Sequence, residues 1–226
     1  MLKILKILNF LINVPKKTYY KFFSKYFDGK IKNYDRHKSY DDYVNKQIEK
    51  TTDPARIDKW KGAEWDKKVL GFERLFQRNN AYLNNKKKAI CLGARTGQEV
   101  FVLRELGLDT IGIDLVPFPP YTVKGDIHNL SFKDKEFDFV FTNIFDHSLY
   151  PEKFISEMER ISCEKANIIL NIQLNNPGDD YSENLINDPK IIIKMFKDSK
   201  NSYQFQNDGT ENLFIKNYNL KFSETK

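Results

Sequence analysis

Between residues 88 and 172 the hydrophobic positions change repeatedly from short continuous runs to helical spacing. The continuous runs are bounded by glycine or polar turns, and their length predicts buried strands. The segments between the runs repeat apolar residues at a helical period, which predicts amphipathic helices. The strands are expected at 88–92, 110–114, 137–143 and 166–172, and the helices at 98–106 and 151–161. Such alternation of strand and helix predicts an α/β fold with parallel strands.

The segment before the first strand is polar and favours helix. Thr51-Thr52-Asp53-Pro54 is a helix-start signal, and a break is expected around Gly62. We interpret residues 39–85 as a helical region that packs on the core or forms a lid over it. Trp60 and Trp65 are its expected anchors, with substrate stacking by one of them as the alternative.

The first 14 residues place Lys3, Lys6, Asn9 and Asn13 on one helical stripe, and every other position after Met1 is apolar. A helix of that length is ~21 Å long, which is too short for a hydrocarbon core of ~30 Å. Lysines alternate with aromatic residues from 16 to 32, a pattern typical of anionic membrane surfaces. Residues 1–38 are therefore interpreted as a membrane-contacting segment. Packing on the protein's own core or on a second subunit is the alternative.

Composition narrows these alternatives. The 226 residues carry a formal net charge of +6, and residues 1–90 hold 22 Lys and Arg against 10 Asp and Glu. That basic half favours an anionic partner. A nucleic-acid partner is disfavoured because no recognised RNA-binding motif appears. Only two cysteines are present, which excludes a disulfide scaffold and favours a cytoplasmic protein, with the inner face of a membrane as the alternative location.

The first strand runs into a glycine turn at Gly93 and Gly97, and the next helix starts there. Glycines let the backbone turn tightly near a ligand, and the helix N-terminus offers free N–H groups. Asp114 ends the following strand, where a carboxylate can accept hydrogen bonds from ribose hydroxyls. Asp126 is placed to accept from an adenine amino group, and Ile127 to pack on the ring. A nicotinamide cofactor is disfavoured because the G-x-G-x-x-G spacing is not met.

Residues 87–175 resemble the class I S-adenosyl-L-methionine (SAM)-dependent methyltransferases, close to the methyltransferase type 11 group. Their glycine motif resembles residues 91–97, and their acidic positions match Asp114 and Asp126. The resemblance implies a Rossmann-like, doubly wound, mostly parallel seven-stranded sheet over residues 86–226, with an N-terminal helical extension. The last two strands are expected as an antiparallel pair at 202–206 and 213–218. The resemblance also implies SAM as cofactor, with Leu115 and Asn143 as further cofactor contacts.

Two departures from that motif change how the methionine end would be held. Cys91 stands where an acidic residue is common, and Arg95 replaces the middle glycine. We expect Arg95 to bind the methionine carboxylate and Glu99 its ammonium group.

The segment after the third strand supplies the candidate catalytic residues. His147 is the expected general base for a hydroxyl acceptor, with Asp146 beside it. A capping or structural role for His147 is the alternative, and His37 and His128 are weaker candidates. The sequence shows no metal cluster with credible ligand spacing.

The sequence thus predicts a methyltransferase that modifies a small-molecule or glycan- or lipid-linked acceptor, at oxygen. The alternative is a catalytically inactive SAM-fold module attached to a membrane or protein partner. The sequence leaves the oligomeric state and the identity of the acceptor open.

Overall fold

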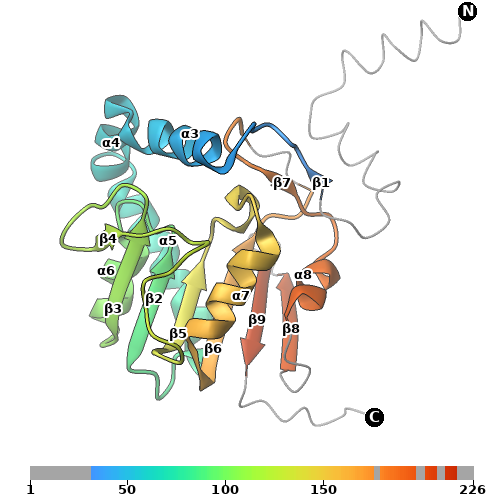
Figure 1. Ribbon diagram of the computed structural model, residues 1–226. Helices are drawn as coiled ribbons and strands as arrows, with labels where there is room; N and C mark the ends of the chain where they lie inside the picture. Colours follow the sequence, from blue (N-terminus) through green and yellow to red (C-terminus); the bar gives the residue numbers. More distant parts are fainter. Residues whose placement is uncertain (1–31, 176–178, 197–201, 208–211, 218–226) are drawn as a thin grey trace, which may run out of the picture.

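The computed structural model describes residues 32–175, 179–196, 202–207 and 212–217 (Figure 1). The predicted amphipathic helix at residues 1–14 and the lysine- and aromatic-rich stretch up to residue 31 lie outside the described residues. Within the described residues, no helix has both the length and the hydropathy needed to cross a membrane.

The centre of the protein is one twisted sheet with strand order β4-β3-β2-β5-β6-β9-β8. The first five of these strands pair in parallel, which confirms the predicted Rossmann-like α/β fold. At the other edge, β9 is antiparallel to both β6 and β8. The strands are β2 (Lys88–Leu92), β3 (Asp109–Asp114), β4 (Thr122–Lys124), β5 (Phe137–Thr142), β6 (Ser162–Ile172), β8 (Ser202–Asn207) and β9 (Asn212–Asn217).

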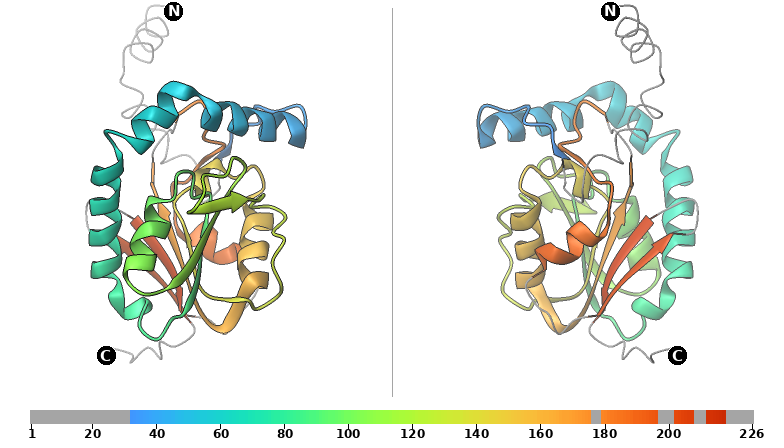
Figure 2. Two further views of the ribbon diagram at one scale, coloured as in Figure 1. Left: turned by 90° about the vertical axis from the view of Figure 1, so that its left-hand side faces the viewer. Right: turned by 90° about the vertical axis from the view of Figure 1, so that its right-hand side faces the viewer.

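Helices cover both faces of this sheet (Figure 2). One face packs on α5 (Trp65–Arg78) and α6 (Gln98–Glu105), and the other on α7 (Pro151–Ile161) and α8 (Lys190–Met195). Successive strand residues point to opposite faces, so Ala89 and Cys91 join the first layer while Ile90 and Leu92 join the second. Because both faces are buried, the central strands are continuously apolar, which made them visible in the sequence. Each buried large side chain contributes roughly 1.5–3 kcal/mol.

Two further helices lie across the end of the sheet where the parallel strands terminate (Figure 1). They are α3 (Tyr40–Thr52), here called the cap helix, and α4 (Pro54–Lys61). The Ser39 hydroxyl accepts from the N–H of Asp42 at 3.1 Å, and the Asp53 carboxylate accepts from the N–H of Ala55 at 2.9 Å, so both helices begin at side-chain caps. Asp53 was part of the predicted helix-start signal.

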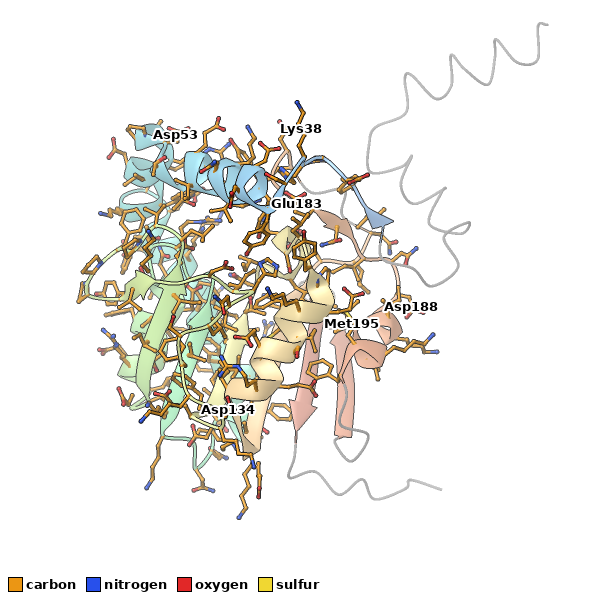
Figure 3. The ribbon with its side chains drawn as sticks, in the orientation of Figure 1. Lys38, Asp53, Asp134, Glu183, Asp188 and Met195 are labelled. Carbon is orange, nitrogen blue, oxygen red and sulfur yellow. The ribbon has the colours of Figure 1, made fainter. Side chains whose placement is uncertain are left out.

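The chain before the cap helix is fastened to a loop from the C-terminal third. β1 (Lys32–Asn33) pairs antiparallel with β7 (Asn184–Leu185), and the N–H of Tyr34 donates to the carbonyl of Glu183 at 2.9 Å. We call residues 179–187 the cap loop. Glu183 lies beneath the cap helix (Figure 3), and its Oε1 lies 2.8 Å from Nε2 of His37. The cap helix and the cap loop together cover the edge of the sheet at which the parallel strands end.

The differences from the predicted elements are local. β6 begins at Ser162, four residues before the predicted strand. The prediction missed these four residues because they form no apolar run. β4 was not predicted, since it has three residues and its Val123 is 44% exposed. The β1–β7 pair was also missed. The short helices η2 (Asn80–Tyr82) and η3 (Phe145–His147) complete the described elements.

Candidate active site

Three adjoining hollows open at the carboxyl edge of the sheet, beneath the cap helix. We name each after one residue, and each volume includes open solvent at the mouth: the Asp114 hollow, with about 560 Å³; the Glu99 hollow, with about 460 Å³; and the Asp146 hollow, with about 700 Å³. His147 lines all three. The Asp114 hollow is lined by Tyr43, Gln47, Lys50, Thr51, Gly93, Arg95, Asp114, Leu115, Gly125, Asp126, Ile127, Ile144 and His147.

The other two hollows meet at Asn143, which follows β5. The Glu99 hollow is lined by Lys68, Phe72, Gly93, Ala94, Arg95, Gln98, Glu99, Asn143, Ile144 and His147. The Asp146 hollow is lined by Asn143, Asp146, His147, Asn171, Gln173, Asp179 and Ser182. All the predicted site residues except Gly97 therefore line this connected space.

The glycine turn has the backbone that the sequence suggested. Gly93 and Gly97 have φ of +72° and +85°, in the left-handed region that favours glycine. A Cβ at Gly93 would collide with the side chain of Ile144, and one at Gly97 with that of Tyr121. Gly97 thus acts by shaping the turn at the start of α6, since it lines none of the three hollows.

Asp114 is the last residue of β3, and both of its carboxylate oxygens accept hydrogen bonds from backbone N–H groups. Its Oδ2 accepts from the N–H of Arg95 at 2.9 Å, and its Oδ1 accepts from the N–H of Val116 at 3.2 Å. Each oxygen retains a second lone pair for a ligand hydroxyl. Burial raises the pKa of Asp114 despite these bonds. Leu115, the next residue, lines the same hollow.

Asp126 is held from two sides. Its Oδ2 accepts from the Tyr40 hydroxyl of the cap helix at 2.6 Å, and its Oδ1 accepts from the N–H of His128 at 2.8 Å. Burial acts to raise the pKa of Asp126, but the hydrogen bonds from His128 and Tyr40 outweigh it and lower that pKa to about 2. Asp126 is therefore a fixed anion at the wall of the Asp114 hollow, with Ile127 beside it.

His128, a weaker candidate for the general base, belongs to the core. Its side chain is completely buried and lines none of the three hollows. Its Nε2 accepts from the N–H of Tyr150 at 3.2 Å, so Nδ1 carries the proton and lies 2.8 Å from the Tyr40 hydroxyl. The chain of bonds from Tyr150 through His128 and Tyr40 to Asp126 joins the cap helix to the sheet.

The Arg95 side chain lines both the Asp114 and the Glu99 hollow. Its guanidinium carbon lies 4.1 Å from the centre of the Trp60 ring. Burial lowers the pKa of Arg95, opposed by the charges of Asp114 and Glu99. Among the described residues, its guanidinium makes no hydrogen bond or ion pair. Trp60 is itself held by Gln98, whose Nε2 donates to the Trp60 carbonyl at 3.0 Å.

Glu99 lies in the first turn of α6 and lines the Glu99 hollow together with Lys68. Burial raises the pKa of Glu99 to about 7, against the opposing charges of Lys68 and Arg95. The carboxylate therefore has little compensation for its lost hydration, and a cationic ligand group would stabilise it.

His147 is oriented by the cap loop. Its Nδ1 lies 2.7 Å from the carbonyl oxygen of Tyr181, which can only accept, so Nδ1 carries the proton of the neutral ring. Nε2 is then left with a free lone pair. It lies 4.0 Å from Oδ2 of Asp146, which accepts from the Ser182 hydroxyl at 3.2 Å. This arrangement fits a general base whose tautomer is fixed by its second nitrogen.

Sequence reasoning missed the contribution of the cap helix. Tyr43, Gln47, Lys50 and Thr51 line the Asp114 hollow, but their spacing follows an ordinary helix face and carries no motif. Burial lowers the pKa of Lys50 to about 8, opposed by Asp179, whose Oδ2 lies 3.6 Å from Nζ.

Two weaker candidates lie outside the three hollows. His37 binds Glu183 instead of facing a ligand space. Trp65 lies against Tyr121, with 5.6 Å between the ring centroids.

Known proteins resemble this chain in both sequence and structure. Residues 90–170 match the family model described as a methyltransferase domain. No curated protein matches the chain. A SAM-dependent methyltransferase from Archaeoglobus fulgidus is similar in structure, with 14% identity, a TM-score of 0.57 and coverage of 73% of this chain and 100% of that one.

Two further solved structures are similar. One is the Burkholderia thailandensis 1,6-didemethyltoxoflavin-N1-methyltransferase with bound 1,6-didemethyltoxoflavin and S-adenosylhomocysteine, at 11% identity, a TM-score of 0.60 and coverage of 85% of this chain and 97% of that one. The other is a possible histamine N-methyltransferase from Thermotoga maritima, at 15% identity, a TM-score of 0.52 and coverage of 72% and 99%. At identities this low, the structural similarity shows a shared fold and nothing more specific.

Proposed function

We propose that this chain, which carries a methyltransferase-domain segment within the class I SAM-dependent methyltransferase fold, binds SAM and methylates a hydroxyl group. The acceptor is a small molecule or a glycan- or lipid-linked group. The observation that carries the proposal is His147, which lines the two hollows suited to SAM and also the Asp146 hollow beside them.

The Asp114 hollow suits the adenosine part of SAM. Asp114 would accept from the ribose hydroxyls, and Asp126 from the adenine amino group, through the lone pairs left by their present partners. Ile127 offers an apolar surface to the ring, and Leu115 lies beside it.

The Glu99 hollow suits the methionine part, because its charges complement an amino acid. The Arg95 guanidinium, which has no hydrogen-bond partner among the described residues, would bind the carboxylate, and Glu99 would bind the ammonium group. Asn143 lies at the opening toward the Asp146 hollow. This distribution explains how the site can function with Arg95 in place of a glycine.

When bound, SAM supplies a methyl group on a positively charged sulfur, whose bond to that methyl breaks and leaves its electron pair on sulfur. The chain's residues then have to align the acceptor and remove its proton. Nε2 of His147 takes the proton of the acceptor hydroxyl as the oxygen lone pair forms the new bond to carbon. Asp146, 4.0 Å away, stabilises the resulting imidazolium. The cap helix limits the access of water.

The proposal is tested by measuring S-adenosylhomocysteine produced from SAM in the presence of glycan, lipid-linked and small hydroxylated acceptors. A methyltransferase releases it in proportion to methylated acceptor. The alternative, an inactive SAM-fold module, binds SAM with saturation and releases none with any acceptor.

We also propose that residues 1–38 contact an anionic membrane surface, on the pattern of lysines and aromatic residues alone. Residues 32–34 and 36–37 contact the cap loop, so lipid contact is assigned to residues 1–31. In the same proposal residues 39–85 are the lid and residues 86–226 the SAM-binding domain. Sedimentation of the full chain with vesicles containing phosphatidylserine tests the membrane contact.

A further inference from the structure

The Asp146 hollow differs in chemistry from the two hollows assigned to SAM. The seven described residues that line it are all polar: three amides, two carboxylates, one hydroxyl and the His147 ring. Apart from that imidazole, no aromatic ring and no aliphatic side chain of the described residues lines it. A flat apolar acceptor would leave the buried and half-buried groups of this lining without hydrogen bonds, at about 1–3 kcal/mol for a fully buried group, whereas the exposed Gln173 and Asp179 would stay hydrated.

Two of the amides have unused hydrogen-bonding capacity. Asn143 follows β5 and Asn171 is the next-to-last residue of the neighbouring parallel strand β6, and both line the hollow at this edge of the sheet. Neither side-chain amide has a hydrogen-bond partner in the part of the chain that the structure describes. Each amide offers donors and an acceptor, which is the combination that pairs with a hydroxyl group.

The carboxylates are already partly compensated. Asp179 is 3.6 Å from Nζ of Lys50 and accepts from the N–H of Tyr181 at 2.9 Å, while Asp146 accepts from Ser182. Two carboxylates that already have partners still repel a phosphate or carboxylate ligand. They also stabilise a bound cationic amine less than two carboxylates without partners would. The remaining lone pairs suit neutral hydroxyl donors.

We propose that the Asp146 hollow is the acceptor subsite and that it selects a neutral polyhydroxylated ring, a sugar. Asn171 and Gln173 determine this specificity by binding hydroxyls of the ring, and a neighbouring hydroxyl is presented to Nε2 of His147. The inference rests on the proposed function, since it identifies the substrate class of the same site. About 700 Å³ of space, part of it open solvent at the mouth, accommodates one sugar ring.

Saturation-transfer NMR on the full chain tests this inference, with and without S-adenosylhomocysteine. The probes are the methyl glycosides of glucose, galactose, mannose, rhamnose and N-acetylglucosamine, with glucose 6-phosphate as the anionic probe and spermidine as the cationic one. We expect saturable binding of at least one neutral sugar, weaker by at least tenfold in Asn171→Ala and in Gln173→Ala. S-adenosylhomocysteine affinity should stay within twofold of wild type in both variants.

Asn84→Ala is the matched control, because Asn84 is exposed and precedes β2, at the other end of the sheet. It should bind sugar as the wild type does. Binding of none of the neutral sugars, preference for glucose 6-phosphate or spermidine, or unchanged sugar binding in both variants overturns the inference. Because sugar binding is also measured without nucleotide, a failure to bind S-adenosylhomocysteine would count against the proposed function separately.

Discussion

The guanidinium of Arg95 lies 4.1 Å from the centre of the Trp60 ring, which joins the glycine turn to α4, the helix that follows the cap helix. Arg95 has φ of +47°, a backbone conformation that usually favours glycine, and its N–H donates to Asp114. The Trp60 ring thus packs against a half-buried guanidinium that lines the Asp114 and Glu99 hollows. In the proposed function this guanidinium, at the position of the motif's middle glycine, binds the methionine carboxylate.

Replacing Arg95 with alanine should weaken SAM binding by about 10- to 100-fold, since a hydrogen bond to a charged group contributes about 1.5–3 kcal/mol. Binding of 5′-methylthioadenosine, which lacks the amino acid, should not change. Calorimetric titration of both ligands checks this. An equal loss for the two ligands would mean that Arg95 supports the turn and does not bind the carboxylate.

The affinity for S-adenosylhomocysteine should depend on pH through Glu99. The pKa of Glu99 is raised to about 7, so below pH 7 the free protein holds it protonated and neutral. Because the ammonium group needs the carboxylate, affinity should fall by about tenfold for each pH unit below 7. In Glu99→Gln the affinity should be lower and this dependence absent. An unchanged pH profile in that variant assigns the ammonium to another group.

His147→Asn should lower kcat by about 10²–10⁴-fold on a hydroxyl acceptor, the usual contribution of a general base. Asparagine keeps a donor near the position of Nδ1, so the bond to Tyr181 can be retained. The affinity for S-adenosylhomocysteine should change little. A loss of activity below tenfold, with the pH profile retained, would return His147 to a structural role.

Tyr40→Phe should destabilise the fold by roughly 1–3 kcal/mol, since it removes the hydroxyl between Asp126 and the buried His128. Tyr150→Phe is the matched control. The Tyr150 ring stacks on that of Tyr40 with 5.7 Å between centroids, but its hydroxyl bonds to none of the described residues. Urea unfolding at pH 7 measures both. Equal stability of the two variants would show that the Tyr40 hydroxyl holds nothing in place.

The sequence was most informative where both faces of a strand are buried. β2 and α7 were predicted with their observed bounds, because a continuous apolar run and a helical apolar stripe follow directly from burial. The three-residue strand β4 has an exposed side chain at its centre and gave no such signal. Burial of an element produces a local hydrophobic pattern in its sequence, whereas a short, exposed element has no such pattern.

Some residues of the site could likewise be predicted from the sequence, whereas their contacts with distant segments could not. Asp114 follows from its place after a strand, but the partner of Asp126 is Tyr40, 86 residues earlier, and the orienting contact of His147 comes from Tyr181. Such pairings depend on tertiary packing between distant segments, for which one sequence offers no spacing rule. The structure was needed to show that the cap helix takes part in the site.

Calorimetric titration of the full chain with SAM and with S-adenosylhomocysteine tests the central claim most directly. We predict saturable binding of one nucleotide per chain, weaker by at least tenfold in Asp114→Asn, which keeps an acceptor for the N–H of Arg95. Asp109→Ala, at the exposed start of the same strand, should bind as the wild type does. No binding of either nucleotide by the wild-type chain would contradict the account.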